Sequence, residues 1–378
     1  MTLPTICVRK GGLVPIMVRE VMEAAGVREV VAEGDVVLVK PNFVRPAVSA
    51  TGVTTNLEVV EGIVDVVRSL GATPVIGESC GVPFRTADVF SALGVDALAK
   101  KLDVRLVDLD TYPAKDYEVP RPQTLDTVHL TSLLDEVDSV ISVPVAKTHN
   151  VTTITGAVKN MHGTVPDTEK WRTHLSGVNE AIVDIAQAAR PDLSVLDMTT
   201  CLEGHGPMTG DPVPLDAVAA CLDPVAIDAF IAHLTGYEPE DVRHLVLAHD
   251  AGLGQLEYAV EGDAPEPRRF ARARFITPSL LIQQYWTRVQ YFLVRRFGID
   301  LRSINKNAGG LILQYPRFTA KCTGCGDCVD ACPVDALTKG EPPRTDSSTC
   351  LCCGICWNVC PVEGAAGYTR SLRWLLDG

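Results

Sequence analysis

The chain has 378 residues, 46% of them hydrophobic and 21% charged, which is ordinary for a globular protein and leaves room for one large domain and a small one. It carries 34 Lys and Arg against 47 Asp and Glu, and the formal net charge of −13 argues against sequence-independent binding of nucleic acid. No secretory signal and no run of about 18 apolar residues is found, so the 13 cysteines indicate metal thiolates in a reducing, cytoplasmic compartment and not disulfides.

Residues 1–265 alternate between strand-like apolar runs and helical periods, which predicts a layered α/β domain with a mostly parallel sheet. The first buried strand is expected at 35–44, followed by a helix that begins with a capping box at Thr55 and Glu58 and ends at Gly71. Further strands are expected at 73–79, 104–110, 139–145 and 193–198, and further helices at 86–102, 177–190 and 223–236.

Polar and glycine-rich segments follow the expected strands at their carboxyl ends, which is where ligands bind in open α/β sheets. Glu78, Asp108 and Asp110 close two of these strands. The residues that we expect to line a crevice there are Lys40, Asn42, Lys147, His149, Lys159, Asn160, His162, Glu203 and His205. Four of them are lysines or histidines within sixteen residues of otherwise apolar sequence. Such donors favour binding of an anion, with His149, His162, His205 and Glu203 as the catalytic acid–base candidates.

Each of these residues also has a plain structural interpretation. Lys40 can be a solvated strand end, the other lysines and histidines can be caps or surface groups, and EGHGP at 203–207 can be a turn. Cys80 and Cys201 can be inert or reactive thiols. Neither a Walker phosphate loop nor a G-x-G-x-x-G motif is found, so ATP hydrolysis and Rossmann-type nicotinamide or flavin binding are not predicted. A flavin held by another fold would leave no readable motif.

Residues 266–315 are expected to link the two domains. The segment 280–301 is apolar but is interrupted by glutamines and arginines, which is typical of an amphipathic helix. We expect this helix to pack between the domains, with a membrane surface or a partner groove as the alternative.

The carboxyl-terminal segment, 316–378, contains two copies of one cysteine pattern. Residues 322–333 read CTGCGDCVDACP, and a shift of 28 residues lays them on CLCCGICWNVCP at 350–361. Each copy is C-x2-C-x2-C-x3-C-P, the run of bacterial two-cluster ferredoxins, in which the fourth cysteine ligates the cluster of the other run. The spacing predicts a small α+β ferredoxin-like domain that holds two [4Fe-4S] clusters.

The eight predicted ligands form two sets, namely Cys322, Cys325, Cys328 and Cys360 for one cluster, and Cys350, Cys353, Cys356 and Cys332 for the other. Cys352 aligns with Gly324 and is the surplus thiol, either a small buried residue beside a cluster or a redox group. Zinc is the weaker interpretation, because a zinc site closes with four ligands and does not need two interlocked runs.

Several segments resemble the bacterial and archaeal family known as domain of unknown function 362. They are LVKPNFV, TTNLEVVEGIVDVVRSLGATPVIGESCG, SVPVAKTHNVTTITGAVKNMHG, LEGHGP and CLDPVAIDAF, and the resemblance covers residues 5–250 and the cysteine-rich tail. Members of that family often carry a fused two-cluster ferredoxin module. The resemblance implies an iron–sulfur protein with a redox role, and it includes the crevice residues named above without assigning them a reaction. Cys80 in GESCG departs from the hydroxyl-bearing or small residue expected there.

The sequence leaves three functions open. The first is a ferredoxin-linked oxidoreductase, in which a soluble electron donor or acceptor exchanges electrons through the clusters with an anionic small molecule. Lys40, Asn42, Lys147, Lys159 and Asn160 would bind that molecule. The second is an electron-transfer protein that docks a partner enzyme and performs no chemistry of its own. The third is a non-redox enzyme, such as an isomerase or hydratase, whose clusters serve structure alone.

Overall fold

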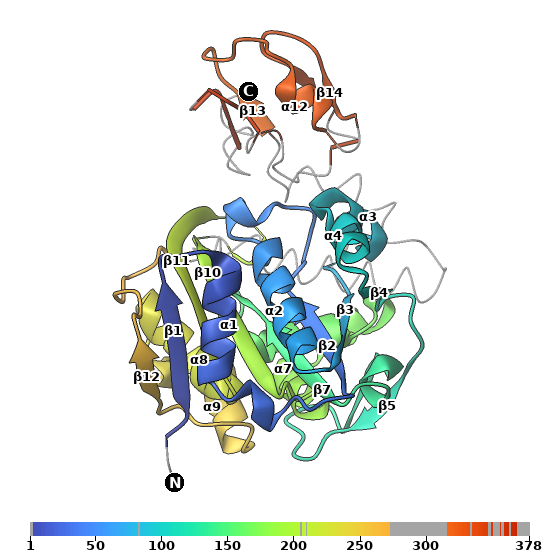
Figure 1. Ribbon diagram of the computed structural model, residues 1–378, viewed down its shortest axis with the longest axis vertical. Coiled ribbons are helices and arrows are strands. Elements are labelled where there is room, and N and C mark those ends of the chain that lie inside the picture. The colour runs from blue at the N-terminus through green and yellow to red at the C-terminus, as the bar shows by residue number, and fades with distance from the viewer. Residues whose placement is uncertain are drawn as a thin grey trace.

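The computed structural model of the protein describes residues 3–81, 84–204, 206–208, 210–272, 316–332, 335–346, 349–350, 356, 359–362 and 364–368. The side chains of Trp171, His174, Leu175 and Tyr368 are outside this description. The linker helix expected at 280–301 also lies outside the described residues. What is described consists of an α/β body and a small cysteine-rich module, residues 316–368 (Figure 1).

A ten-stranded sheet forms the centre of the α/β body, with the strand order β12-β1-β11-β10-β7-β2-β3-β4 and with β8 and β9 attached beside β10. Its strands are β1 (Thr5–Lys10), β2 (Val36–Pro41), β3 (Thr73–Glu78), β4 (Arg105–Asp108), β7 (Ser139–Val143), β8 (Val145–His149), β9 (Thr153–Thr155), β10 (Leu193–Glu203), β11 (Asp211–Cys221) and β12 (Ala259–Gly262). Along this path every pair is parallel except those that β11 makes with β1 and β10. The predicted mostly parallel α/β layer is confirmed.

Helices cover both faces of this sheet (Figure 1). They are α1 (Val14–Ala24), α2 (Leu57–Ser69), α3 (Thr86–Leu93), α4 (Val95–Leu102), α5 (Ala157–Asn160), α6 (Lys170–Leu175), α7 (Val178–Ala188), α8 (Pro224–Thr235) and α9 (Arg243–Asp250). Successive residues of a strand point to opposite faces, so Val37 and Val39 pack in one core with α1 to α4, while Leu38 packs in the other with α7 and α9. Continuous apolar strands are expected in a parallel sheet that is buried on both sides.

Two local predictions differ from the structure. The capping box is wrong, because the N-cap of α2 is Asn56, whose side chain accepts the Glu58 N–H. The hydroxyl of Thr55 instead donates to the Val143 carbonyl at 2.8 Å and so joins two distant loops. The helix expected at 86–102 is two helices, because Gly94 has a φ of +76°, which ends α3 in the left-handed conformation.

A strand hairpin stands apart from the main sheet. It pairs β5 (Ala114–Glu118) with β6 (Thr127–Thr131) in antiparallel register. The loop between them is held by Asp184 of α7, whose carboxylate accepts three backbone N–H groups from 123–125.

The cysteine-rich module is a small α+β unit. Its elements are β13 (Pro316–Phe318), α12 (Asp327–Asp330), β14 (Leu337–Thr338), β15 (Arg344–Thr345) and β16 (Ala366–Tyr368). β13 pairs with β16 and so joins the two ends of the module, while β14 pairs with β15. Its small core contains Cys328, Leu337 and Cys356. The described part of this core is too small to stabilise a unit of about 50 residues. The stability of the module therefore depends on a bound metal group or on contacts with another part of the protein.

Within the part of the chain that the structure describes, no helix is long and apolar enough to cross a membrane.

Candidate functional site

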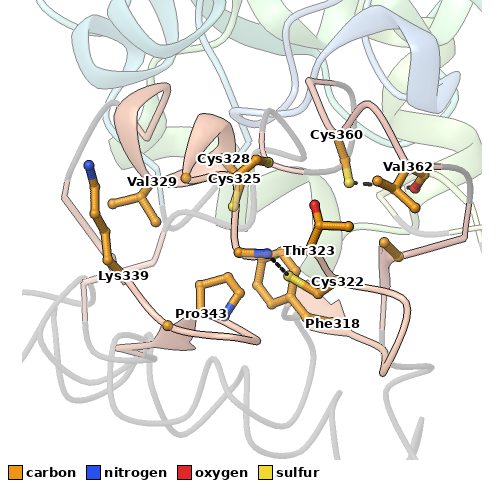
Figure 2. A pocket seen from close by; sticks show the side chains of 14 residues that line it. Phe318, Cys322, Thr323, Cys325, Cys328, Val329, Lys339, Pro343, Cys360 and Val362 are labelled. Carbon is orange, nitrogen blue, oxygen red and sulfur yellow. Dashed lines mark hydrogen bonds between the residues drawn. The ribbon is translucent and has the colours of Figure 1, made fainter.

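Four cysteines of the module line one pocket, as Figure 2 shows. Cys322, Cys325 and Cys328 lie in and around the loop that leads into α12, and Cys360 comes from the second cysteine run. These four are the residues that the spacing predicts as one ligand set, including the crossover of the last cysteine. Folding therefore brings a distant thiol to the three that are close in sequence.

Glycines allow the first run to wrap around this pocket. Gly324 and Gly326 have φ values of +67° and +92°, a region of backbone conformation that residues with a Cβ rarely adopt. The turn places the Gly324 N–H 3.5 Å from the Cys322 Sγ, and the Ala336 N–H lies 3.3 Å from the Cys332 Sγ. Hydrogen bonds to sulfur stabilise thiolates and help to set the reduction potential of a bound cluster.

The electrostatics of the pocket favour a metal group with several ions. Burial raises the pKa of the Cys328 thiol, and Cys325, Cys322 and Cys360 raise it further. Thiolates that repel one another in this way are stabilised when cations bind between them. Among the described residues, no three Cys, His, Asp or Glu side chains are placed to hold a single metal ion. The four cysteines line one pocket, and four cysteine thiolates are the ligands of a [4Fe-4S] cluster.

The second predicted ligand set is described in part. Cys332 and Cys356 both pack in the small core of the module, and the Cys350 N–H donates to the Asp346 carbonyl at 3.0 Å. Cys353, the fourth member, lies outside the described residues, and so does the surplus Cys352. The second cluster therefore stays a prediction.

In the α/β body, the carboxyl ends of β2 and β3 hold a buried ion pair. Lys40 Nζ lies 2.8 Å from Glu78 Oε1, and both side chains are almost completely buried. The Glu78 carboxylate also accepts the N–H groups of Ser79 and Phe43, at 2.9 and 3.0 Å. Gly163 covers the pair, because a Cβ there would lie 2.0 Å from Glu78 Oε1. Burial lowers the pKa of Lys40 and raises that of Glu78, and the attraction between the two opposes both shifts.

Two asparagines connect this ion pair to a second lysine. Asn160 Nδ2 donates to the Lys40 carbonyl at 3.0 Å, and its Oδ1 accepts from Asn42 Nδ2 at 3.2 Å. Asn42 Oδ1 in turn accepts from Lys147 Nζ, which also donates to the Val53 carbonyl at 2.7 Å. Four of the predicted ligand-binding residues thus form one buried hydrogen-bond network.

Lys147 and Lys159 lie in surroundings that oppose their charge. Burial lowers the pKa of Lys147 to about 7, and the positive charge of Lys159 is the next cause. Burial also lowers the pKa of Lys159 to about 8, although part of this side chain still reaches solvent. Lys147 hydrogen-bonds only to neutral oxygens, and neither amine has a carboxylate partner among the described residues.

The position of Lys159 and Asn160 depends on Asp228 of α8. They belong to α5, which is a single helical turn. The Asp228 carboxylate caps this turn by accepting the N–H groups of Ala157 and Val158, at 2.5 and 3.0 Å. Burial raises the pKa of Asp228 to about 7. Because the Asp228 carboxylate caps the first N–H groups of this turn, it fixes the positions of Lys159 and Asn160.

The free energy of unfolding should rise from pH 7 to pH 8.5, and Lys147→Met should reduce this rise. The pKa of Lys147 is about 7 in the folded protein against an ordinary value of 10.5, so the unfolded chain binds more protons in this range and stability increases with pH. We expect the free energy of unfolding of the variant to rise less steeply with pH than that of the wild type, by about 1 kcal/mol per pH unit. Urea titrations followed by circular dichroism measure it.

Lys101→Met is the matched control for this pH dependence. Lys101 is 63% exposed, so the free energy of unfolding of this variant should change with pH as it does in the wild type. Equal slopes for Lys147→Met and the wild type would contradict a depressed pKa for Lys147.

The two described histidines of the candidate set make local contacts. His149 Nδ1 accepts the N–H groups of Val151 and Thr152, at 2.9 and 3.1 Å, so its proton lies on Nε2 when the ring is neutral. His162 Nε2 lies 3.1 Å from the Thr173 hydroxyl. The Nδ1 of His149 is therefore occupied as a loop acceptor, and His162 is the histidine next to Gly163 over the ion pair.

Of the other two acid–base candidates, the structure describes Glu203, which makes its contacts outside this network. Glu203, at the end of β10, accepts the Ala271 N–H at 3.0 Å and lies 3.6 Å from Arg268, so it holds the segment that follows the α/β body. His205 lies outside the described residues.

Sequence reasoning missed several members of the buried network. Glu78 was visible as a polar residue at a strand end, but its pairing with Lys40 was not predicted. Next to it, Lys170 Nζ donates to the Ser79 carbonyl and hydroxyl, at 3.0 and 2.5 Å, and the Ser79 hydroxyl lies 2.5 Å from Asp110 Oδ1. No sequence signal marks Lys170, because it comes from α6, which is distant in the sequence from Ser79.

Two cysteines of the α/β body are buried thiols. Burial raises the pKa of Cys80 to about 12, and it raises the pKa of Cys201 well above its ordinary value. Thiols that stay protonated at neutral pH are poor nucleophiles, which favours the inert interpretation of both.

Comparison with known protein families finds a match in the α/β body and another in the cysteine-rich module. The family model described as "Domain of unknown function (DUF362)" matches residues 37–233, and a model for a 4Fe-4S binding domain matches residues 315–338. Thylakoid-associated protein sll1697 of Synechocystis sp. (strain ATCC 27184 / PCC 6803 / Kazusa) is 28% identical over 264 residues, which are 68% of this chain and 80% of the relative.

A solved structure, the lactate racemase apoprotein from Thermoanaerobacterium thermosaccharolyticum, aligns with a TM-score of 0.41 and 11% identity. The alignment covers 61% of this chain and 57% of that protein, so this chain spans little more than half of its length.

Proposed function

Because the chain belongs to the DUF362 family and ends in a 4Fe-4S binding domain, we propose that it is an iron–sulfur oxidoreductase. In this proposal two [4Fe-4S] clusters supply single-electron transfer between a soluble donor or acceptor and an anionic small molecule in the α/β body. The proposed division is an α/β domain at 1–265, a linker at 266–315 and a ferredoxin-like domain at 316–378.

One observation carries the redox part of this proposal. Cys360, from the second run, lines the same pocket as Cys322, Cys325 and Cys328. The exchange of the fourth cysteine between two runs is the ligation of two-cluster ferredoxins, whose use is electron transfer. A single structural metal ion would not require it.

Two lysines support the proposal that the substrate is an anion. Lys147 and Lys159 are amines in a low-dielectric environment without a carboxylate of their own, and charge-assisted hydrogen bonds to an anion would stabilise both. Lys40 contributes less to this binding, because its charge is already matched by Glu78.

The double substitution Lys147→Met/Lys159→Met should slow electron transfer to the substrate without loss of iron. Protein reduced with dithionite would be mixed anaerobically with a panel of small carboxylates and phosphate esters, and reoxidation would be followed by visible absorbance. Removal of two charge-assisted contacts should slow reoxidation by the active anion about 100-fold. Lys115→Met, at an exposed lysine of β5, is the matched control and should react like the wild type. Reoxidation by none of the anions, or at equal rates in all three proteins, would contradict the proposed reaction.

Full burial of Lys40 and Lys147 favours the second candidate, an electron-transfer protein that docks a partner enzyme, because both amines already have protein acceptors. In that case the double variant would keep the turnover of the partner.

A cytoplasmic location is also a proposal, which the free thiols support. The printed name of the thylakoid-associated relative raises association with a membrane surface as the alternative.

A further inference from the structure

Lys147 lies in a cluster of charged groups in which the positive groups outnumber the negative ones. The groups that act on it are Lys159 of α5, Lys40 of β2, Arg45 of the loop after β2, Glu78 of β3 and Asp197 of β10. Glu78 is engaged by Lys40 at 2.8 Å. Asp197 is engaged by backbone and hydroxyl donors, which include the Asn56 N–H at 2.7 Å. Neither carboxylate is therefore paired with Lys147 or Lys159.

A buried hydroxyl without a partner lies beside Lys147. Thr155 of β9 is the ladder partner of Lys147 in the β8–β9 hairpin, so the two side chains leave the hairpin on the same face. The Thr155 hydroxyl is buried and makes no hydrogen bond to any described residue. Buried polar groups nearly always have a partner, so an unsatisfied hydroxyl beside Lys147, which has no carboxylate partner among the described residues, indicates a ligand atom.

We propose that Lys147, Lys159 and Thr155 bind one doubly charged anion, a phosphate group or a pair of carboxylates, between β8, β9 and α5. This inference rests on the proposed function, because it defines the charge of the substrate at the same site. Two ammonium groups are neutralised by two negative charges, and a monoanion would leave one buried cation unmatched. Lys159 is only partly buried whereas Lys147 is fully buried, so a ligand would enter the site at Lys159.

Binding of the anion should be accompanied by uptake of protons. The pKa of Lys147 is about 7 and that of Lys159 about 8 without an anion, and a nearby negative charge raises both. His244 of α9 is the other titratable neighbour of Lys159, and its pKa of about 3 keeps it neutral throughout. At pH 8 we therefore expect uptake of about one proton for each dianion bound.

Isothermal titration of the oxidised, cluster-loaded protein with malonate at pH 8, in two buffers of different ionisation enthalpy, measures the affinity and the proton uptake together. Malonate is the dicarboxylate probe and is fully ionised at this pH, inorganic phosphate is the tetrahedral probe, and acetate is the monoanion. We expect malonate or phosphate to bind at least about 10-fold more tightly than acetate. Equal affinity for acetate, or binding without proton uptake, would overturn the proposal.

Two substitutions test the residues. Lys159→Met should weaken binding of the dianion at least about 10-fold and should reduce proton uptake. Thr155→Val keeps the shape of the side chain and removes an unsatisfied hydroxyl, so the variant should fold as well as the wild type while its affinity falls about five-fold. Ser139→Ala removes another unsatisfied buried hydroxyl, at the opposite end of the sheet, and is the matched control with unchanged affinity. Wild-type affinity in Lys159→Met or Thr155→Val would reject the assignment.

This experiment separates the inference from the proposed reaction, because it involves no reduction of the protein. Dianion binding with proton uptake, in a protein that no anion reoxidises, would retain the site and reject the oxidoreductase. Reoxidation by a monoanion alone would retain the oxidoreductase and reject the dianion.

Discussion

Cys360→Ala should remove about four of the eight irons expected per chain, although Cys360 lies in the second cysteine run. Its thiol lines the pocket of Cys322, Cys325 and Cys328, so its loss leaves that cluster with three ligands. Iron and sulfide analysis of anaerobically purified protein, together with electron paramagnetic resonance of the reduced state, measures the change. The remaining cluster should keep its signal.

Double substitutions distinguish the crossover from ligation within each run. Cys322→Ala/Cys360→Ala should retain about four irons, because both residues serve one cluster, whereas Cys322→Ala/Cys332→Ala should retain almost none, because these two residues serve different clusters. Cys352→Ala, at the cysteine that the sequence repeat leaves unassigned, is the control and should keep the full iron content. If the first double variant lost all its iron while Cys322→Ala/Cys332→Ala kept half, each cluster would be held within its own run.

Lys40→Met should destabilise the α/β body by about 3–5 kcal/mol, because it leaves the Glu78 carboxylate buried without its cation. Lys40 Nζ lies 2.8 Å from Glu78 Oε1, and the two side chains are 0% and 3% exposed. Glu78 would then bind a proton, so the loss should be larger at pH 8 than at pH 5. Urea titration at both pH values measures the difference.

The matched control is Lys101→Met. Its partner Glu61 lies at 2.6 Å, but Lys101 is 63% exposed, and pairs of this kind contribute about 0–1 kcal/mol. Lys40→Met/Glu78→Gln should recover a large part of the lost stability, because no buried charge is left unpaired. A loss below about 1 kcal/mol in Lys40→Met would show that the buried pair is not a stabilising unit.

The charged groups at the carboxyl ends of the strands differ in how they are paired. Lys40 and Glu78 neutralise each other, and Asn42, which is bonded to Asn160, accepts a hydrogen bond from Lys147 Nζ of β8. Lys159 is partly buried and has no hydrogen-bond or carboxylate partner among the described residues. Within that part of the chain, the buried members of the network therefore have partners and Lys159 does not.

Sequence reasoning reached the right strand ends but could not rank the residues there. Lys40 and Lys147 look alike in the sequence, since each ends an apolar strand, yet one is paired with a carboxylate and the other is not. Glu203 looked like an acid–base candidate beside glycines, but residues 268–271 fold back and occupy its carboxylate. The helix boundaries at Asn56 and Gly94 were also missed, because caps depend on the path of the chain before and after the helix.

The sequence by itself determined the alternation of strands and helices and the parallel α/β layer, and it predicts the two cysteine sets, because periodicity and ligand spacing are local properties of a connected chain. Only the tertiary structure decided which charges are matched. Pairing and burial depend on side chains that meet from distant segments, as Lys40 meets Glu78 and as Lys147 meets Asn42. The free energy of a buried charge is set by those few neighbours, and no local pattern in the sequence contains them.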